Sequence, residues 1–260
     1  MWATNERSLW RALREMLPRC RRIALVGAGG KTTAGLTLAR EMMELGEPVL
    51  FTTTTHILYP AAADVAVGVG EPESPAVWSA VASGRLPVLA REPAGRKLRG
   101  FGLLEMAKLV DFWPNHRLVV EADGSAGRPL KAPGDHEPAL FPLADTVLYV
   151  AGLRGIGKPL TSEYVHRPER FSLLTGLPLA QTIRPRHVAD LIHHPAGGHK
   201  NLPPGAKLVV LLTGIATPED FLMGTALARL LTAGGQERVL LSGLAAGRAT
   251  VRGRFGDAGP

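Results

Sequence analysis

The sequence predicts an α/β fold, a mainly parallel, doubly wound sheet with helices on both of its faces. Two observations support this prediction. Apolar runs of strand length alternate along the chain with segments whose apolar residues recur at helical spacing. A glycine-rich turn that ends in Gly30-Lys31-Thr32 joins the first of these strands to a helix. At 260 residues, the chain is long enough to bury one large core of this kind.

The first strand, turn and helix are predicted within residues 21–46. Ile23 to Val26 form a short apolar run typical of a buried parallel strand. Apolar residues recur at helical spacing after the turn, and Gly46 is a typical helix stop. The backbone N–H groups of residues 29–31 therefore lie at a helix N-terminus, where unsatisfied donors and partial positive charge favour phosphate.

The turn matches most of a phosphate-binding loop, so the predicted fold is P-loop-containing. In the pattern GxxxxGK[ST], the lysine, here Lys31, reaches the terminal phosphates and the hydroxyl of Thr32 binds magnesium. The opening glycine of the pattern falls on Leu25, however, and the nearest upstream glycine that can open the turn is Gly27. These residues alone leave two interpretations open, a shortened phosphate loop and a chance match.

The rest of the chain continues the alternation of strands and helices. The predicted elements are, in order, an amphipathic helix at 8–17, strands at 48–57 and 63–69, a helix at 74–83, a strand at 86–91, a helix at 102–112, strands at 116–125 and 145–152, two helices within 168–194, a strand at 206–214, a helix beginning in TPED at 217–220, and a strand at 237–243. In TPED, Thr217 can cap the helix and Asp220 can close a capping box.

Three parts of the chain follow from these elements. Residues 1–21 are predicted to hold an amphipathic helix packed on the core. Residues 22–243 are predicted to form the P-loop nucleotide-binding α/β domain. Residues 244–260, rich in glycine, arginine and alanine, are predicted to be a flexible C-terminal tail.

The composition favours small anionic ligands over nucleic acid. The formal net charge is +7, yet only 5% of the residues are aromatic and no segment interleaves basic with aromatic residues. No apolar run is long enough to span a bilayer, and charges interrupt the N-terminal segment, so we expect no membrane partner and a cytoplasmic location. The single cysteine, Cys20, excludes an internal disulfide and a zinc site made of thiolates alone within one chain.

Polar residues follow two of the predicted strands at the point where each strand ends. In such sheets, ligands bind beyond the carboxyl ends of the strands. Thr54, Thr55 and His56 end one strand, where they either face the phosphate loop or merely form strand and turn. Glu121 and Asp123 end another, where a carboxylate can bind magnesium or position water opposite the phosphate loop.

Two later segments are rich in glycine, proline and charge. Residues 124–142 are too long for an ordinary connector, and Arg128, Lys131, Asp135, His136 and Glu137 either grip an anionic substrate or face solvent. The segment that begins GLRGIGK at residue 152 has the same style and adds Lys158, His166 and Arg167. The histidines of HHPAGGHK, at 193–200, have no acid or cysteine at ligand spacing, so we interpret this stretch as a loop.

Five of these segments occur in the order seen in one known family. They read VGAGGKTT at 26–33, VLFTTTTHILYP at 49–60, VVEADGSAGRPLKAPGDHEPALFP at 119–142, GLRGIGKPLTSEYVHRPE at 152–169 and HHPAGGHKNLPPGAK at 193–207. Through this combination the chain resembles the YqeC family of accessory proteins for selenium-dependent molybdenum hydroxylases. The resemblance extends from about Ile23 to Leu241.

The resemblance implies roles for particular residues. For nucleotide binding, as ATP or GTP, it implies Gly27, Gly29, Gly30, Lys31, Thr32 and Thr33. It also singles out Thr54, Thr55, His56, Glu121, Asp123, Ser125, Lys131, His136, Glu137, Lys158, His166 and Arg167. We expect Thr54 and Thr55 beside the nucleotide, magnesium on Thr32 with Glu121 or Asp123, and His56, Lys131 and His166 on a second substrate.

A second resemblance concerns the turn alone. The spacing GxxGKTT, from Gly27 to Thr33, is similar to the shortened phosphate loop of the Mur ligases, which activate a carboxylate with ATP and place a glutamate on magnesium. Here Glu121 would take that part. This resemblance favours a shortened loop in which Leu25 belongs to the strand.

These observations lead to competing functional hypotheses. The first is a magnesium-dependent nucleotide-binding accessory protein that hydrolyses ATP or GTP, or transfers a phosphoryl or nucleotidyl group, during maturation of a selenium-dependent molybdenum hydroxylase. The second is a nucleotide-gated chaperone or cofactor-binding module without efficient turnover. A Mur-like ligase is a third. The expected partners are the nucleotide and a molybdenum hydroxylase or its cofactor.

Overall fold

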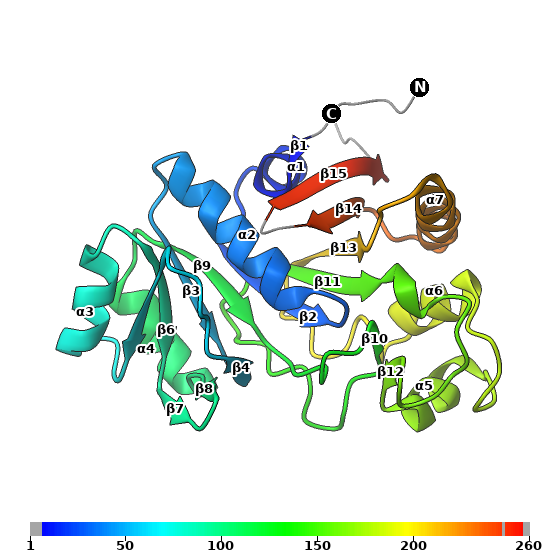
Figure 1. Cartoon of the computed structure of the whole chain (residues 1–260), viewed down its shortest axis with the longest axis horizontal. Coiled ribbons are helices and arrows are strands. Elements are labelled where there is room, and N and C mark those ends of the chain that lie inside the picture. The colour runs from blue at the N-terminus through cyan, green and yellow to red at the C-terminus, as the bar shows by residue number, and fades with distance from the viewer. Residues whose placement is uncertain (1–6, 246–247, 257–260) are drawn as a thin grey trace.

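The computed structural model describes residues 7–245 and 248–256. Within these residues, a ten-stranded sheet has the order β1-β15-β14-β13-β11-β2-β9-β3-β6-β5 (Figure 1). In that order, the strands are Arg7–Ser8, Arg248–Phe255, Val239–Ala245, Lys207–Thr213, Thr146–Gly152, Arg22–Gly27, Arg117–Glu121, Val49–Thr53, Leu86–Ala90 and Val65–Val69. The sheet runs from β14 to β5 through parallel pairs, and β15 is antiparallel to both of its neighbours.

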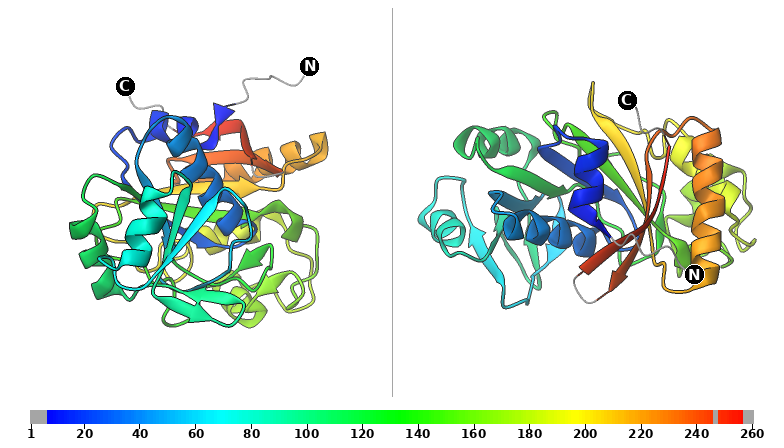
Figure 2. Two further views of the ribbon diagram at one scale, coloured as in Figure 1. Left: turned by 60° about the vertical axis from the view of Figure 1, so that its left-hand side comes forward. Right: turned by 90° about the horizontal axis from the view of Figure 1, so that it is seen from above.

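The helices lie on both faces of this sheet, which confirms the predicted fold class (Figures 1 and 2). They are α1 (Leu9–Met16), α2 (Lys31–Glu44), α3 (Pro75–Ala82), α4 (Leu103–Phe112), α5 (Pro168–Thr175), α6 (Pro185–His193) and α7 (Pro218–Ala233), with the 3-10 turn η1 at Leu153–Gly155. The helices predicted from periodicity are therefore confirmed, including the pair within 168–194.

Two apolar cores flank the sheet, because alternate residues of each buried strand face opposite sides. In β2, Ile23 and Leu25 join the core beneath α1 and α2. Ala24 and Val26 join the core beneath the helices of the other face. The strand is therefore apolar throughout, as a parallel strand covered on both faces must be. Its end is consequently fixed in position, together with the turn that follows it.

The N-terminal helix α1 packs against α2. Ser8 caps α1 by accepting a hydrogen bond from the backbone of Arg11, and Leu9 and Leu13 are fully buried. The Glu41 carboxylate of α2 accepts hydrogen bonds from the backbone N–H groups of Leu9, at 3.2 Å, and Trp10, at 2.6 Å. These contacts tie the first helix to the helix that begins at the glycine-rich turn.

Two small sheets depart from the predicted elements. The predicted strand 48–57 divides into β3 and the short strand β4 (His56–Leu58), which pairs in a separate sheet with β8 (Lys97–Arg99), itself paired with β7 (Glu92–Ala94). In the loop 124–142, β10 (Leu130–Lys131) pairs in parallel with β12 (Val165–His166). Sequence periodicity does not detect strands of two or three residues, since they span at most one alternation.

The prediction of a flexible tail from residue 244 onward is wrong for residues 248–255. These residues form β15, which pairs antiparallel with β14 and with β1. Val251 is 5% exposed and belongs to the core beneath α1 and α2. The composition of the segment misled the prediction, because the backbone pairing of β15 with β14 and β1 does not require an apolar strand. Residues 246–247 and 257–260 lie outside the described residues.

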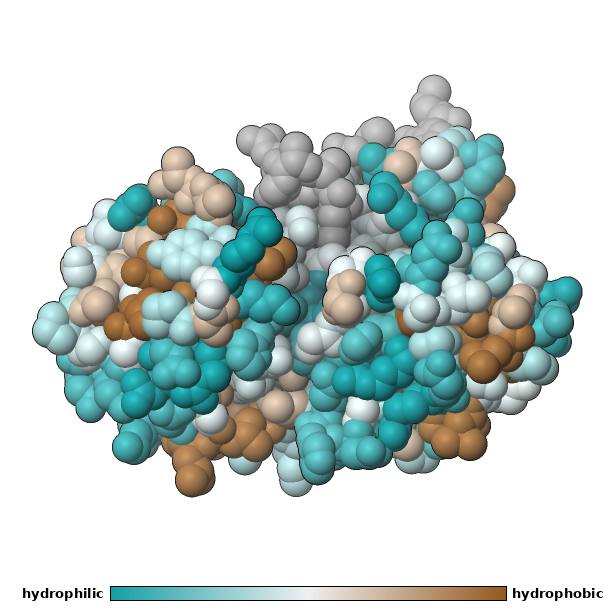
Figure 3. Space-filling view, turned by 60° about the horizontal axis from the view of Figure 1, so that its bottom comes forward, coloured by the Kyte–Doolittle hydropathy of each residue, from teal (hydrophilic) through white to brown (hydrophobic). Residues whose placement is uncertain are grey.

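Among the described residues, no helix has the length and apolar character needed to cross a membrane. The face shown in Figure 3 is mainly hydrophilic, and its hydrophobic residues gather in separate patches.

Candidate functional site

The glycine-rich turn begins where β2 ends. Gly27, Gly29 and Gly30 have φ angles of +90°, +86° and +117°. A Cβ atom on Gly27 would lie 2.2 Å from the carbonyl oxygen of Val150, so the turn packs directly on β11. Leu25, at the position of the missing glycine, is fully buried in β2 and pairs with Glu121 of β9. The turn thus opens at Gly27 and Leu25 belongs to the strand, as predicted.

Lys31 is the first residue of α2 and is almost completely buried. Its Nζ donates a hydrogen bond to the carbonyl oxygen of Gly27 at 2.7 Å. It also lies 3.1 Å from Oδ1 of Asp123 and 3.8 Å from Oε1 of Glu121. The ammonium group is therefore held inside the turn, where oxygen atoms surround it.

Glu121 ends β9, beside the strand that leads into the turn. Its Oε2 accepts a hydrogen bond from the Thr32 hydroxyl at 2.7 Å. Burial raises the pKa of this carboxyl group, and the nearby Lys31 and the Thr32 hydrogen bond offset the rise only in part. Adjacent parallel strands β2 and β9 thus bring a hydroxyl and a carboxylate together at the N-terminus of α2.

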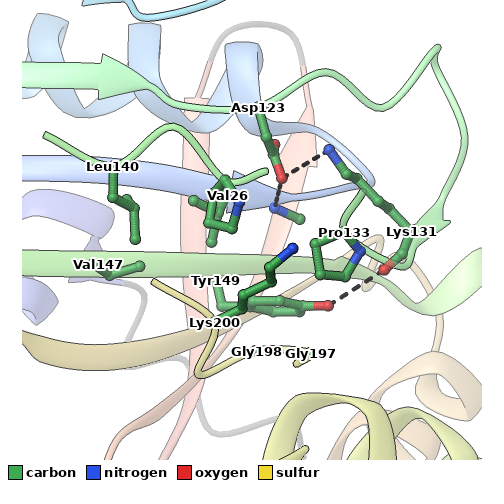
Figure 4. Close-up of a pocket in the computed structure, with 12 residues that line it drawn as sticks. Val26, Asp123, Lys131, Pro133, Leu140, Val147, Tyr149, Gly197, Gly198 and Lys200 are labelled. Carbon is green, nitrogen blue, oxygen red and sulfur yellow. Dashed lines mark hydrogen bonds and ion pairs between the residues drawn. The ribbon is translucent and has the colours of Figure 1, made fainter. Parts of the chain in front are cut away.

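Asp123 lies between two lysines. Its Oδ2 accepts a hydrogen bond from the backbone N–H of Gly27 at 3.0 Å and lies 3.0 Å from the Nζ of Lys131 (Figure 4). Its Oδ1 faces Lys31. Both Asp123 and Lys131 are almost inaccessible to solvent, with exposed fractions of 2% and 1%. A buried charge needs such partners, because leaving it unpaired is costly.

The ion pairs continue from Lys131 to the surface. The Nζ of Lys131 lies 2.8 Å from Oε2 of Glu137, which lies 2.6 Å from Nη1 of Arg167. Burial alone would raise the pKa of Glu137, but hydrogen bonds from Lys131, the Gly134 backbone and Arg167 lower it to about 2. We call the resulting series the charge ladder: Glu121, Lys31, Asp123, Lys131, Glu137 and Arg167.

His166 lies beside this ladder, because β12 pairs with β10 and places it opposite Lys131. Burial and the positive charges of Arg167 and Lys131 lower its pKa. The imidazole is therefore neutral at pH 7, and it can donate one hydrogen bond and accept another. Lys131 and His166, both predicted to contact a second substrate, are thus brought together.

The other residues predicted for the site either hydrogen-bond to backbone groups or lie outside the charge ladder. Thr54 is half-buried and donates to the Ala139 carbonyl oxygen at 2.8 Å, while Thr55 accepts a backbone hydrogen bond from Gly100. His56 is exposed on β4 opposite Arg99, in a different small sheet from Lys131 and His166. The remaining positions are half-buried Ser125 and exposed His136. The structure therefore does not bring His56 together with Lys131 and His166.

A small space lies under the charge ladder. Its volume is about 10 Å³, room for a single water molecule. Figure 4 shows Asp123 and Lys131 above it and Tyr149 below, with the Tyr149 hydroxyl 3.5 Å from the carbonyl oxygen of Lys131. Lys200 also lines this space, and its Nζ donates to the Asp135 carbonyl oxygen at 2.8 Å. Little empty space therefore remains between the charge ladder and the residues that lie beneath it in Figure 4.

A much larger groove opens on the other side of the turn. Its volume is about 880 Å³, and it runs from Gly29, Gly30 and Thr33 to the N-terminus of α7. The sequence analysis missed most of its lining, including Arg154, Thr213, Glu219 and Met223. TPED was interpreted only as a capping motif, which the structure confirms. Lys158, singled out by resemblance, lines the groove with its Nζ 5.8 Å from the centre of the Tyr164 ring.

Magnesium fits the chemistry of the donors at the turn. Among the described residues, no group of three or more histidine, cysteine, aspartate or glutamate side chains could hold a metal ion. Magnesium does not need one, since it usually takes one or two protein oxygen ligands and completes its shell with water and phosphate. Thr32 and the buried Glu121 carboxylate supply such oxygens, and a cation there would offset the burial of Glu121.

The fold and the site together define an α/β protein with a mainly parallel sheet, in which a glycine-rich turn opens a helix beside two strand-end carboxylates. Comparison with known proteins gives the family. The model of the YqeC protein family matches residues 23–169. The uncharacterized protein YqeC of Escherichia coli (strain K12) is 32% identical over 198 residues, which cover 76% of this chain and 77% of that protein. The chain therefore belongs to the YqeC family.

Proposed function

We propose that this protein is a magnesium-dependent nucleotide-binding protein whose phosphate site is the glycine-rich turn at 27–33. One observation carries the proposal. The Lys31 ammonium group, the Thr32 hydroxyl and the Glu121 carboxylate meet at the N-terminus of α2, at the carboxyl ends of β2 and β9. A cation, a hydroxyl and an acid around a helix N-terminus are what a phosphate–magnesium pair requires.

The residues would divide the work as follows. Backbone N–H groups of Gly29, Gly30 and Lys31 would bind phosphate oxygens. The Lys31 ammonium would leave the carbonyl oxygen of Gly27 and contact the terminal phosphate, where negative charge develops during transfer. Thr32 and Glu121 would hold the magnesium ion, which neutralises phosphate charge when bound.

Asp123 would then be able to contact a second reactant. When Lys31 moves to a phosphate, the Asp123 carboxylate keeps Lys131 and the N–H of Gly27 as partners. Its carboxylate oxygens would be available to orient a water molecule or second substrate near the terminal phosphate. His166, neutral and beside Lys131, would complete a polar surface for that second reactant.

As an accessory protein, the chain would use this nucleotide in the maturation of a selenium-dependent molybdenum hydroxylase, the role that the family resemblance implies. Phosphoryl or nucleotidyl transfer and nucleotide hydrolysis are the reactions that this set of groups can support. The hydroxylase, or its cofactor, would then be the second partner.

A nucleotide-gated binding module is a second candidate, and the charge ladder favours it. The ladder connects Lys31 of the turn with Lys131 and Glu137 of the 124–142 loop through Asp123. Withdrawal of Lys31 toward phosphate would change the charge balance of that loop. A gated module would bind nucleotide and alter the loop without efficient turnover.

Calorimetric titration with non-hydrolysable ATP and GTP analogues and magnesium tests the phosphate site. We expect saturable binding that Lys31→Ala weakens by about 100-fold or more, because it removes the charged contact to the terminal phosphate. Lys108→Ala, an exposed lysine of α4, is the matched control and should bind like the wild type. Absence of binding of both analogues to the wild type would contradict the proposal.

Phosphate release then separates the two candidates. With ATP or GTP, and with a candidate hydroxylase present, an enzyme should turn over faster and Lys31→Ala should abolish that rate. A gated module should instead show nucleotide-dependent protection of the 124–142 loop from proteolysis at an unchanged, slow rate of phosphate release.

A further inference from the structure

The groove beside the glycine-rich turn carries an inference that rests on the proposed nucleotide site. It begins at Gly29, Gly30 and Thr33, of which the two glycines would contact phosphate. It continues past Gly152 at the end of β11 and Thr213 at the end of β13. Its volume of about 880 Å³ lies within the range of small-molecule sites.

The arrangement of the strands fixes the direction in which a nucleotide would extend. β9, with Glu121 and the following Asp123, lies on one side of β2, and β11 and β13 lie on the other (Figure 1). Terminal phosphate and magnesium belong on the β9 side, with the two carboxylates. The opposite end of the nucleotide therefore extends over β11 and β13, which is where the groove lies.

The far end of the groove carries charged groups with few close contacts. Among the described residues, the Arg154 guanidinium and the Glu219 carboxylate line the groove, are exposed, and form neither a hydrogen bond nor an ion pair within 4 Å. The charge of Arg154 does act on the nearby Asp220 carboxyl group, whose pKa it helps to lower after the backbone hydrogen bonds that this group accepts. Asp220, next to Glu219, is engaged in capping α7, where it accepts backbone hydrogen bonds from Ala216 and Thr217. Glu219 therefore has its acceptor oxygens available to a ligand.

The two groups complement one base better than the others. Guanine presents two adjacent donors, N1–H and the N2 amino group, which one carboxylate can accept together. On its other edge it presents the acceptors O6 and N7, the preferred partners of a guanidinium. Adenine places a ring acceptor beside its single amino group, so it offers a carboxylate only one donor.

We propose that the groove holds the nucleoside of a guanine nucleotide, with Glu219 accepting from the N1–H and N2 amino groups and Arg154 facing the O6 and N7 edge. Met223 of α7 forms part of the same wall, so a larger side chain there would fill space that the base occupies. The ligand is therefore defined as a guanosine triphosphate or diphosphate with magnesium.

Calorimetric titration with inorganic triphosphate and with non-hydrolysable GTP and ATP analogues, all with magnesium, separates the groove from the phosphate site. The wild type should bind the GTP analogue about tenfold or more tightly than the ATP analogue. Glu219→Gln should weaken the GTP analogue about tenfold and leave inorganic triphosphate unchanged. Met223→Trp should weaken both analogues and also leave inorganic triphosphate unchanged.

Matched controls lie outside the groove. Glu169 follows the first proline of α5 as Glu219 follows the first proline of α7, and Glu169→Gln should bind like the wild type. Leu222, the exposed neighbour of Met223, gives the control Leu222→Trp. These variants show whether a loss arises from the groove or from a general change in charge or bulk.

The outcomes distinguish this inference from the proposed function. Equal or tighter binding of the ATP analogue, or unchanged GTP binding in both Glu219→Gln and Met223→Trp, overturns the guanine groove and leaves the phosphate site standing. If the wild type binds none of the three probes, both the guanine groove and the proposed phosphate site are overturned.

Discussion

The two sides of the glycine-rich turn differ in how their charges are held. On the β9 side, Lys31, Asp123 and Lys131 are buried and each has at least one partner of opposite charge at about 3 Å. On the β11 and β13 side, Arg154 and Glu219 are exposed in an open groove. The buried charges need partners of opposite sign for the protein to fold, whereas the exposed charges of the groove can contact a ligand.

This difference teaches which substitutions can report on function. A residue of the charge ladder contributes to folding as well as to any chemistry, so losing it changes both. A residue of the groove can be changed with little effect on the fold, so a loss of binding there is informative. The following predictions test that contrast, beginning with the largest expected effect.

Asp123→Asn should destabilise the protein the most, by about 3 to 5 kcal/mol, because it leaves Lys31 and Lys131 buried without their shared counter-charge. Urea unfolding measures the loss. Asp111→Asn, on the exposed surface of α4, should change the free energy of unfolding by no more than about 0.5 kcal/mol. Equal stabilities of the two variants would show that the ladder does not hold the fold.

Gly29→Ala should destabilise by about 2 to 4 kcal/mol. The residue has a φ of +86°, and its Cβ would lie 2.5 Å from the backbone of Gly152, so strain and overpacking add. Gly157→Ala is the matched control: its φ is +81°, but its Cβ would meet nothing within 4 Å, so only the strain of about 1 to 2 kcal/mol applies. Thermal or urea unfolding compares the two, and a Gly157→Ala loss as large as that of Gly29→Ala would contradict close packing of the turn on β11.

Glu137→Gln should reduce stability at neutral pH by about 2 kcal/mol, since it removes a charged acceptor from Lys131 and Arg167. In the folded wild type, the pKa of Glu137 is about 2, below its ordinary value of 4.5. The carboxylate therefore stabilises the fold fully above pH 4.5, and this contribution is lost as the pH drops toward 2. Unfolding measured between pH 6 and pH 2 should therefore show a shallower decline in Glu137→Gln than in the wild type. Parallel curves for the two proteins would refute the assignment.

Glu219→Gln and Arg154→Ala should have the smallest effect on stability, within about 0.5 kcal/mol, because both side chains are exposed and form no close ion pair among the described residues. Urea unfolding of each variant beside the wild type checks this. A loss above about 1 kcal/mol in either variant would place it with the charge ladder and remove the contrast between the two sides.

The sequence alone predicted the elements correctly where the local apolar pattern agrees with the packing of the folded protein. The strand ending at Gly27, the helix after it and the order of the parallel elements follow from apolar periodicity, because both faces of β2 must be buried. Glu121 and Asp123 could be proposed as candidate site residues, since the carboxyl ends of parallel strands share one edge. The motif around Lys31 needed only one strand, one turn and one helix.

Only the tertiary structure decided which distant residues meet. Arg167 joins the charge ladder because β12 pairs with β10, a contact between strands of two residues that no periodicity signals. His56 separates from the site because the chain leaves β3 for a small sheet. Residues 248–255 form a strand between β14 and β1 through backbone pairing, which the composition of the segment does not predict. Glu219 reaches the groove because β13 lies two strands from β2 and ends at the same edge, so its position depends on strand order, a property of the whole sheet.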